Sequence, residues 1–372
     1  MLILGIESSC DDTSAAVVSR NGDGRLSVLS NVVASQIETH RLYGGVVPEI
    51  AGRAHAENIS GTVSEALRIA GITPSELDAV AVTTHPGLIG ALLVGVNFAK
   101  AFAYANRLPI ISVNHIEAHT AASYLLENPP KPPFLSLVVS GGHTSFYRVD
   151  DYTSYEEIGG TRDDAAGEAF DKVGRVIGLP YPSGAAMDAL AFEGDRRYEE
   201  KLKAEREAEA LRTADEKPKK ALRRKKKTQL KRYAVLPSPA MKDGLSFSFS
   251  GLKSAALNFI NSKTQSGEEI DRELLASDYT AAVTEGIVSK VPEAVADSGC
   301  TGIVLAGGVA ANRHLRAALS DYCAKHGLSL YLPPVSLCGD NAAMVAAQGA
   351  YEYLRGSFAD TYLGASANDS GL

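Results

Sequence analysis

Residues 2–19, LILGIESSCDDTSAAVVS, hold the pattern that decides the fold. The apolar run 2–6 is typical of a buried strand, a polar turn follows it, and TSAAVVS (13–19) is typical of a returning strand. The same order recurs in 134–149, where the run LSLVV, the turn SGGHT and the run SFYRV follow one another. We interpret the recurrence as a sign of two duplicated lobes, although two unrelated hairpins would give the same pattern.

Strand and helix patterns alternate over most of the chain. Pro48 stands at the start of an expected helix and Gly71 just past its end, and Asn114 is the expected N-cap of another helix. Such alternation predicts an α/β fold with mixed sheets. The expected helices span 48–70, 90–105, 114–126, 165–178, 184–192, 250–262, 269–296 and 340–354, and the expected strands span 77–83, 109–113, 301–305 and 328–332.

The composition is that of a soluble globular protein, with 372 residues, 45% hydrophobic and 22% charged. The four cysteines lie far apart, which argues against a disulfide scaffold and a four-cysteine zinc site and favours a reducing cytosol. The most apolar stretch, 87–96, is too short for a bilayer, which takes about 20 residues. No signal-peptide pattern is present at the start. We therefore expect a cytoplasmic protein without membrane segments.

The net charge of −7 hides a basic segment, because 217–232 holds ten Lys and Arg residues and no acidic residue. Such a run could contact phosphates of a nucleic acid, or it could be a solvated loop. We treat 195–232 as a charged insertion whose first half could form a solvated helix and whose second half is flexible. The small, polar tail 362–372 is expected to be mobile.

The sequence NHIEAH (114–119) places His115 and His119 four residues apart, so that both side chains project from one face of a helix. Imidazole pairs suit zinc, iron, nickel or copper, although two unrelated histidines give the same spacing by chance. A zinc protease needs its Glu directly after the first His, whereas Glu117 comes one position later and points away. Asp340, at an expected strand-to-helix turn, is the candidate third ligand, and such a triad would leave coordination positions open.

Glycine-rich turns follow two of the apolar strands. SGGHT (140–144) and AGGVA (306–310) permit close approach of the backbone to an anionic ligand. Together with the turn SSCDDT (8–13), they are moderate grounds for a nucleotide site between two lobes. Walker A and Rossmann fingerprints are absent from the sequence, so those nucleotide folds are disfavoured.

Eight ordered motifs resemble the TsaD-type family, the catalytic subunits that make N6-threonylcarbamoyladenosine in tRNA and were once misnamed O-sialoglycoprotein endopeptidases. The resemblance covers nearly the whole chain except 195–232 and the tail. The motifs are GIESSCDDTSAAVV (5–18), HRLYGGVVPEIAGRAH (40–55), NHIEAH (114–119), VVSGGHT (138–144), DDAAGEAFDKVGRVIGLPYPSG (163–184), FSFSGLKSA (247–255), LAGGVAANRHLR (305–316) and CGDNAAM (338–344).

The resemblance implies the two-lobed fold of actin, sugar kinases and heat-shock ATPases. It implies lobes at 1–130, completed by the helix at about 340–355, and at 131–337. It also implies one divalent metal ion per chain, iron with zinc as the alternative, bound by His115, His119 and Asp340. The implied substrate-binding residues are Val138, Val139, Ser140, Gly141, Gly142, Asp171, Gly184, Asp188 and Asn312.

The implied reaction is acyl transfer from threonylcarbamoyl-adenylate to N6 of the adenosine beside the anticodon, in tRNAs reading codons that begin with A. Glu7, Asp11 and Asp12 are the candidates for proton handling. The implied partners are tRNA, a smaller fold-related subunit and a P-loop ATPase subunit. Two other hypotheses are an ATP-dependent phosphotransferase, which the fold alone would favour, and a non-catalytic scaffold subunit.

Overall fold

The computed structural model describes residues 1–214 and 232–368, and it contains two five-stranded mixed sheets. The first sheet has the strand order β3-β2-β1-β4-β5. Its strands are β1 (Leu2–Glu7), β2 (Asp12–Arg20), β3 (Leu26–Ser35), β4 (Ala79–His85) and β5 (Ile110–Asn114). The antiparallel strands β1, β2 and β3 form a meander, and β1 also pairs in parallel with β4.

The second sheet repeats this topology with the order β10-β9-β6-β7-β8. Its strands are β6 (Phe134–Val139), β7 (Thr144–Asp151), β8 (Ser154–Gly160), β9 (Gly302–Ala306) and β10 (Ser329–Tyr331). Here β6, β7 and β8 form the antiparallel meander and β6 pairs in parallel with β9. The matching topologies confirm the expected duplication and the mixed α/β fold.

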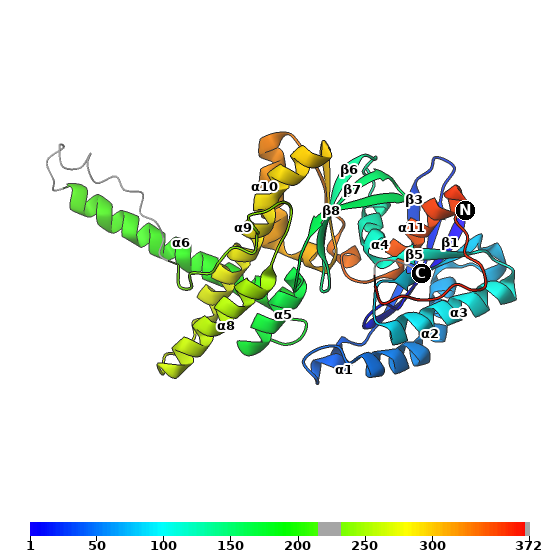
Figure 1. The fold of residues 1–372 in the computed structure, drawn as a ribbon, viewed down its shortest axis with the longest axis horizontal. Coiled ribbons are helices and arrows are strands. Elements are labelled where there is room, and N and C mark those ends of the chain that lie inside the picture. The colour runs from blue at the N-terminus through cyan, green and yellow to red at the C-terminus, as the bar shows by residue number, and fades with distance from the viewer. Residues whose placement is uncertain (215–231, 369–372) are drawn as a thin grey trace.

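Helices α2 (Pro48–Ala70) and α3 (Ile89–Asn106) cover one face of the first sheet, and the short α1 (Ile37–Arg41) precedes them. Helix α2 begins at a proline and ends at Gly71, whose φ of 69° suits glycine. On the other face lie α4 (His115–Ala121) and α11 (Ala342–Arg355), and α4 also contacts β6 and β9 of the second sheet. These two helices therefore lie between the sheets (Figure 1).

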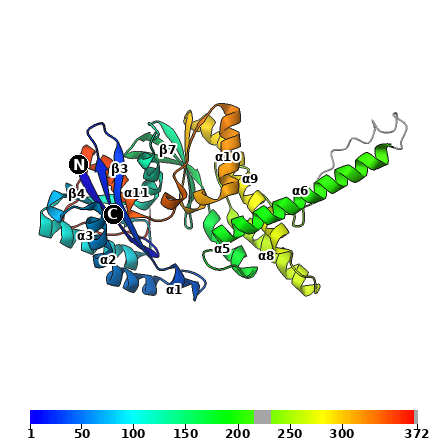
Figure 2. The same ribbon diagram turned by 180° about the vertical axis from the view of Figure 1, so that it is seen from behind.

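The second lobe is completed by helices packed on the outer face of its sheet, around a core that includes Phe146, Phe247 and Tyr279. They are α5 (Ala166–Val176), α6 (Gly184–Ala214), α8 (Phe249–Gln265), α9 (Arg272–Ser298) and α10 (Arg313–His326). Figure 2 shows these helices on the side away from the first lobe. We propose 1–130 with α11, and 131–337, as the two lobes.

Helix α6 is longer than the expected helix at 184–192 and runs without a break through residue 195, where we placed the start of an insertion. The first half of the expected insertion is helical and mostly solvated, as expected, because residues 199–208 are nearly all exposed. Only its first turn is packed, where Asp195 accepts a hydrogen bond from Ser277 and Tyr198 donates to Asp278. The helix then projects from the body of the molecule (Figure 1). Residues 215–231, with most of the basic run, lie outside the described part of the chain.

Helix α3 is long and apolar enough, by length and composition, to cross a membrane, so the apolar segment is longer than 87–96. Its polar residues have partners within the protein: Asn97 donates to Leu93 O, and Lys100 Nζ donates to Leu363 O at 2.9 Å. The expectation of no membrane segment stays a prediction.

The C-terminal tail, expected to be mobile, makes contacts with the first lobe where the structure describes it. Lys100 Nζ donates a hydrogen bond to Leu363 O, Ser366 N donates to Thr84 O, and Gly87 N donates to Ala367 O. Residues 369–372 lie outside the described part of the chain.

Candidate metal centre

Two local structures bring the candidate ligands into position. The Asn114 carboxamide at the end of β5 caps α4 by accepting hydrogen bonds from Ile116 N at 2.7 Å and Glu117 N at 3.4 Å. Helix α4 is therefore fixed at the end of the sheet, with His115 and His119 on one side, one turn apart. This confirms the expected N-cap and the helical placement of the histidine pair.

Asp340 lies two residues before α11, in a turn that Asn341 holds. Asn341 Oδ1 accepts from Met344 N, and Asn341 Nδ2 donates to Gly339 O at 2.9 Å. Helix α11 begins directly on β1, since a Cβ at Gly5 would come within 2.2 Å of Ala342 O. This close approach carries Asp340 to the histidines.

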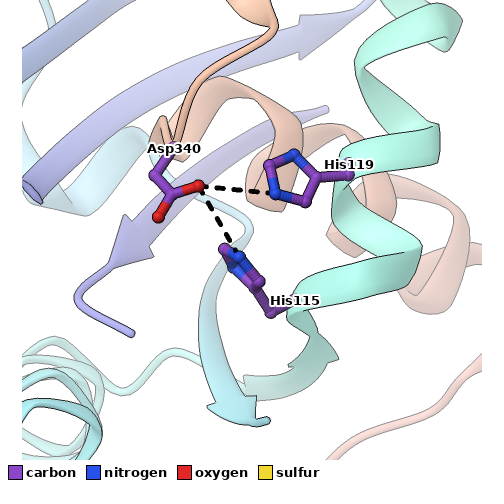
Figure 3. A group of neighbouring side chains, drawn as sticks. All are labelled: His115, His119 and Asp340. Atoms are coloured by element: carbon purple, nitrogen blue, oxygen red, sulfur yellow. Dashed lines mark ion pairs between the residues drawn. The ribbon is translucent and has the colours of Figure 1, made fainter. Parts of the chain in front are cut away.

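The three side chains converge, as Figure 3 shows. Asp340 Oδ1 lies 3.6 Å from His115 Nε2 and 3.4 Å from His119 Nε2. One donor atom from each residue lies within 4.8 Å of the other two. Ligands bound at about 2.1 Å in tetrahedral geometry are about 3.4 Å apart, so the spacing fits a shared metal ion.

The orientation of His115 is set by its other ring nitrogen. His115 Nδ1 lies 3.0 Å from Glu7 Oε2 and 3.2 Å from Ser9 Oγ. The Glu7 carboxylate is itself held, because it accepts hydrogen bonds from Ser9 N and from Thr83 Oγ1. With Nδ1 engaged in this way, Nε2 faces Asp340, which is the arrangement of a metal-binding histidine backed by a carboxylate.

His119 provides the test of whether a metal fits. Its side chain is 1% exposed, and neither ring nitrogen has a hydrogen-bond partner. Leaving a buried polar group without a partner costs free energy, so such groups in proteins usually have one. A metal ion bound at Nε2 would satisfy this nitrogen, and the donor set of two imidazoles and one carboxylate suits iron or zinc.

The site concentrates negative charge. Burial disfavours the imidazolium of His115, but the carboxylates of Glu7 and Asp340 outweigh it and raise the pKa of His115 to about 9. Burial alone would raise the pKa values of Glu7 and Asp340, yet the neighbouring histidines hold both pKa values below their usual range. The pocket therefore favours a positive charge at its centre, either a proton or a metal ion.

The three carboxylates expected to handle protons are in different surroundings. Glu7 is fully buried and engaged with His115, so it is placed to orient that ring. Burial raises the pKa of Asp11, and it raises the pKa of Asp12 to about 6. Asp12 Oδ1 has no hydrogen-bond partner. The charge of Asp340 raises both pKa values further, and the role of the two carboxylates in proton handling stays a prediction.

The two glycine-rich turns lie next to each other at the ends of β6 and β9. Gly307, with φ of 91°, sits so close to β6 that a Cβ would come within 2.4 Å of Val139 O. The start of α5 is tied to the first turn by Gly167 N, which donates to Ser140 O at 3.1 Å. Val138 and Val139 are fully buried strand residues, whereas Gly141 and Gly142 are exposed.

The remaining expected substrate contacts are engaged with the protein. Asp171 Oδ1 accepts from Ser183 N just before Gly184 at the start of α6, and burial raises the pKa of Asp171 to about 6. Asp188 pairs with Arg313 and His314. Asn312 caps α10 by accepting from Leu315 N. These contacts leave the roles of the three residues as predictions.

Sequence reasoning missed several residues of the site. Ser9 and Thr83 hold Glu7, and His143 lowers the pKa of Asp340 through its charge. The only signal in the sequence was that His143 and Ser9 belong to the polar turns already singled out. Thr83 gave no signal, because its role depends on β4 lying beside β1.

Comparison with known proteins gives a consistent result. A family model described as tRNA N6-adenosine threonylcarbamoyltransferase matches residues 27–210 and 200–347. Proteins of that name from Clostridioides difficile and Geobacillus kaustophilus are 44% and 47% identical to the chain. The first alignment covers 99% of the chain and 98% of the relative, and the second covers 98% and 95%.

Solved structures of similar fold are more distant in sequence. Component A of the (R)-2-hydroxyglutaryl-CoA dehydratase of Acidaminococcus fermentans is 16% identical, with a TM-score of 0.50 over 95% of the chain and 99% of that protein. HypF from T. kodakarensis is 13% identical, with a TM-score of 0.57 over 96% of the chain and 48% of that protein. These likenesses support the two-lobed fold.

Proposed function

The chain belongs to the tRNA N6-adenosine threonylcarbamoyltransferase family, and from this premise we propose that threonylcarbamoyl-adenylate is its acyl donor. The acceptor is N6 of the adenosine beside the anticodon, in tRNAs that read codons beginning with A. The convergence of His115, His119 and Asp340, with His119 buried and without a hydrogen-bond partner at either ring nitrogen, is the observation that carries the proposal.

In this reaction a bond forms between N6 and the carbamoyl carbon while the mixed-anhydride C–O bond breaks. AMP leaves with the electron pair, and the amine gives up a proton. AMP is a good leaving group, so the protein has mainly to align the two substrates and stabilise developing charge. The exposed backbone at Gly141 and Gly142, beside the start of α5, suits contact with the adenylate phosphate.

A bound divalent metal, for which we propose iron with zinc as the alternative, would supply a Lewis acid beside the reacting carbonyl. Glu7 acts as a positioning residue that holds His115 with Nε2 toward Asp340. Asp12 is the better-placed proton acceptor, because its raised pKa of about 6 lies near neutral pH and one of its oxygens is unpartnered. Asp11 is the alternative acceptor.

The proposal includes the compartment, the partner subunits and the substrate-binding residues. As expected from the sequence, it works in the cytoplasm with a smaller fold-related subunit and a P-loop ATPase subunit. Val138, Val139, Ser140, Asp171, Gly184, Asp188 and Asn312 remain its proposed substrate-binding residues together with Gly141 and Gly142.

The test is a defined assay with the full chain, the two partner subunits, tRNA and threonylcarbamoyl-adenylate, followed by mass analysis of the nucleosides. We expect threonylcarbamoyladenosine with the wild-type chain and with His326→Ala, a surface control on α10, and a transfer rate about a thousandfold lower with His119→Ala. ATP turnover on small alcohols without tRNA would instead favour a phosphotransferase. Equal product from wild type and His119→Ala would contradict the role of the site.

A further inference from the structure

A cavity of about 320 Å³ lies where the two lobes meet, and we name it the lobe-junction cavity. Its size is at the lower end of the range for ligand-binding pockets. The first lobe contributes Arg41, Tyr43 and Gly44 to its lining, and the second contributes Asp171, Arg175 and Tyr181.

One side of the cavity is formed by the loop 41–44, whose backbone is fixed by hydrogen bonds of the preceding residue, His40. His40 is fully buried, its Nε2 lies 3.1 Å from Gln36 Oε1, and its Nδ1 accepts from Val47 N. Next to His40 in the loop, Leu42 is 83% exposed and Tyr43 is 54% exposed. The Tyr43 ring has no aromatic neighbour among the described residues. The loop thus presents an unpartnered aromatic face from a fixed backbone.

The second wall provides a cation. Arg175 is exposed and makes no ion pair in the described part of the chain, and Nη1 is 3.5 Å from Gly44 O. Its guanidinium covers Gly44, where a Cβ would lie 3.1 Å from Cζ. Arg41 Nε donates to Tyr181 O across the lobes while Nη1 pairs with Glu38. Of the two guanidinium groups, that of Arg175 is available to a ligand.

Two residues that line the cavity interact electrostatically with the acidic groups of the first polar turn. Burial raises the pKa of Tyr181, which lines the cavity, and the charges of Asp11 and Cys10 raise it further. Asp171 also lines the cavity and interacts with Asp11, and Asp11 interacts with Asp340. A molecule in the cavity is therefore within the electrostatic influence of the acidic groups around the proposed reaction centre.

The carboxylates of this centre repel the phosphates of an RNA substrate. A nearby cation would offset that repulsion. A free guanidinium next to an exposed aromatic ring is the combination that binds single-stranded nucleic acid, by phosphate contact and base stacking. We infer that a nucleotide next to the target adenosine enters the lobe-junction cavity, with its base on Tyr43 and its phosphate at Arg175. The inference rests on the proposed function.

The test measures binding of a labelled anticodon stem-loop RNA to the full chain by fluorescence anisotropy over a range of salt concentrations. Arg175→Gln should weaken binding several-fold at low salt and reduce the salt slope by about one. Tyr43→Leu should weaken binding by about tenfold, and Tyr43→Phe should restore it. The control is Arg148→Gln on β7, a partly exposed arginine outside the cavity that pairs with Asp150.

Two further readouts separate RNA contact from a structural role. In the modification assay, Arg175→Gln and Tyr43→Leu should raise KM for RNA more than they lower kcat, with unchanged metal content and melting temperature. RNA affinities equal to wild type in both variants would overturn the inference while leaving the proposed function intact. An inactive wild-type chain with every tRNA tested would instead overturn the proposed function.

Discussion

Two clusters in this molecule are built from histidine and carboxylate side chains, but they differ in whether the histidine ring nitrogens have hydrogen-bond partners. Around His314, both ring nitrogens are paired: Nδ1 lies 2.6 Å from Asp188 Oδ1 and Nε2 lies 3.0 Å from Asp195 Oδ2. Around Asp340, His115 is oriented by Glu7, whereas His119 has no hydrogen-bond partner at either nitrogen. The first cluster is complete without a ligand, and the second is not.

The difference teaches that residue types alone do not mark a site. Histidine and aspartate side by side can simply join helices, as His314 on α10 joins Asp188 and Asp195 on α6. Unsatisfied donors, buried and aimed at a common point, are what indicate a missing ligand. The predictions below test this distinction, beginning with the largest expected effect.

The substitution of His119 by alanine should distinguish most clearly between a metal-binding cluster and a structural one. We expect His119→Ala to lower the transfer rate by about a thousandfold, because it removes a ligand of the proposed metal. The unloaded protein should lose less stability than with His314→Ala, since truncation of His119 removes packing contacts but no hydrogen bond. His314→Ala should show the reverse pattern, with lower stability and retained metal. If both variants lose stability and keep metal, the distinction is wrong.

Glu7→Gln should lower metal affinity by about 10- to 100-fold, because the group that orients His115 is weakened. A competition titration with a chelator measures this effect without an activity assay. Glu352→Gln is the matched control, as Glu352 is a buried carboxylate on α11 that bonds to Gln348. An unchanged affinity in Glu7→Gln would show that His115 needs no support from this carboxylate.

Asp188→Asn should lower the free energy of unfolding by about 2 kcal/mol, since it weakens buried hydrogen bonds to Arg313 and His314. The more exposed Arg313 contributes the smaller part. Urea unfolding measures the loss, and metal content should not change. A raised KM for the adenylate with unchanged stability would instead support the prediction that Asp188 binds substrate.

The smallest expected effect is a pH dependence of the folding stability that the His314 cluster contributes. Burial opposes the charge on His314, but its hydrogen bonds with Asp188 and Asp195 raise the pKa of His314. Burial of Asp188 is outweighed by His314 and Arg313, which lower the pKa of Asp188. Stability from His314 is present below its unfolded pKa of about 6.5 and is lost as pH rises through the folded value.

Stability from Asp188 is present above its unfolded pKa of about 3.9 and is lost as pH falls. The stability difference between wild type and His314→Gln should therefore be largest between about pH 4 and 6.5, on the order of 1 kcal/mol, and shrink toward pH 9. Thermal melts of the two proteins across this range provide the measurement. A difference that grows above pH 7 would contradict the assigned pairing.

Much of this structure could be predicted from local pattern. The buried strands β1, β2 and β6 each contain a short apolar run, and the spacing of His115 and His119 marks a helix face. The strands β3 and β8 were missed because they are half exposed, and SYEEIGG (154–160) has too few apolar residues for a strand pattern. Their pairing with β2 and β7 decides their structure.

The parts that could not be predicted depend on contacts between distant segments. Glu7 meets His115 only because β1 lies close to the end of β5, and Arg41 meets Tyr181 only because the lobes touch. The continuity of α6 through residue 195 was missed because its charged residues indicated a separate solvated segment. In the structure Arg197 pairs with Asp271 at the start of α9.

The most direct measurement is anomalous X-ray scattering from crystals of the full chain loaded with a divalent metal. The account predicts a single strong peak per chain, at about 2.0–2.2 Å from His115 Nε2, His119 Nε2 and an Asp340 carboxylate oxygen. A peak elsewhere, or no peak under conditions that support transfer, would contradict it.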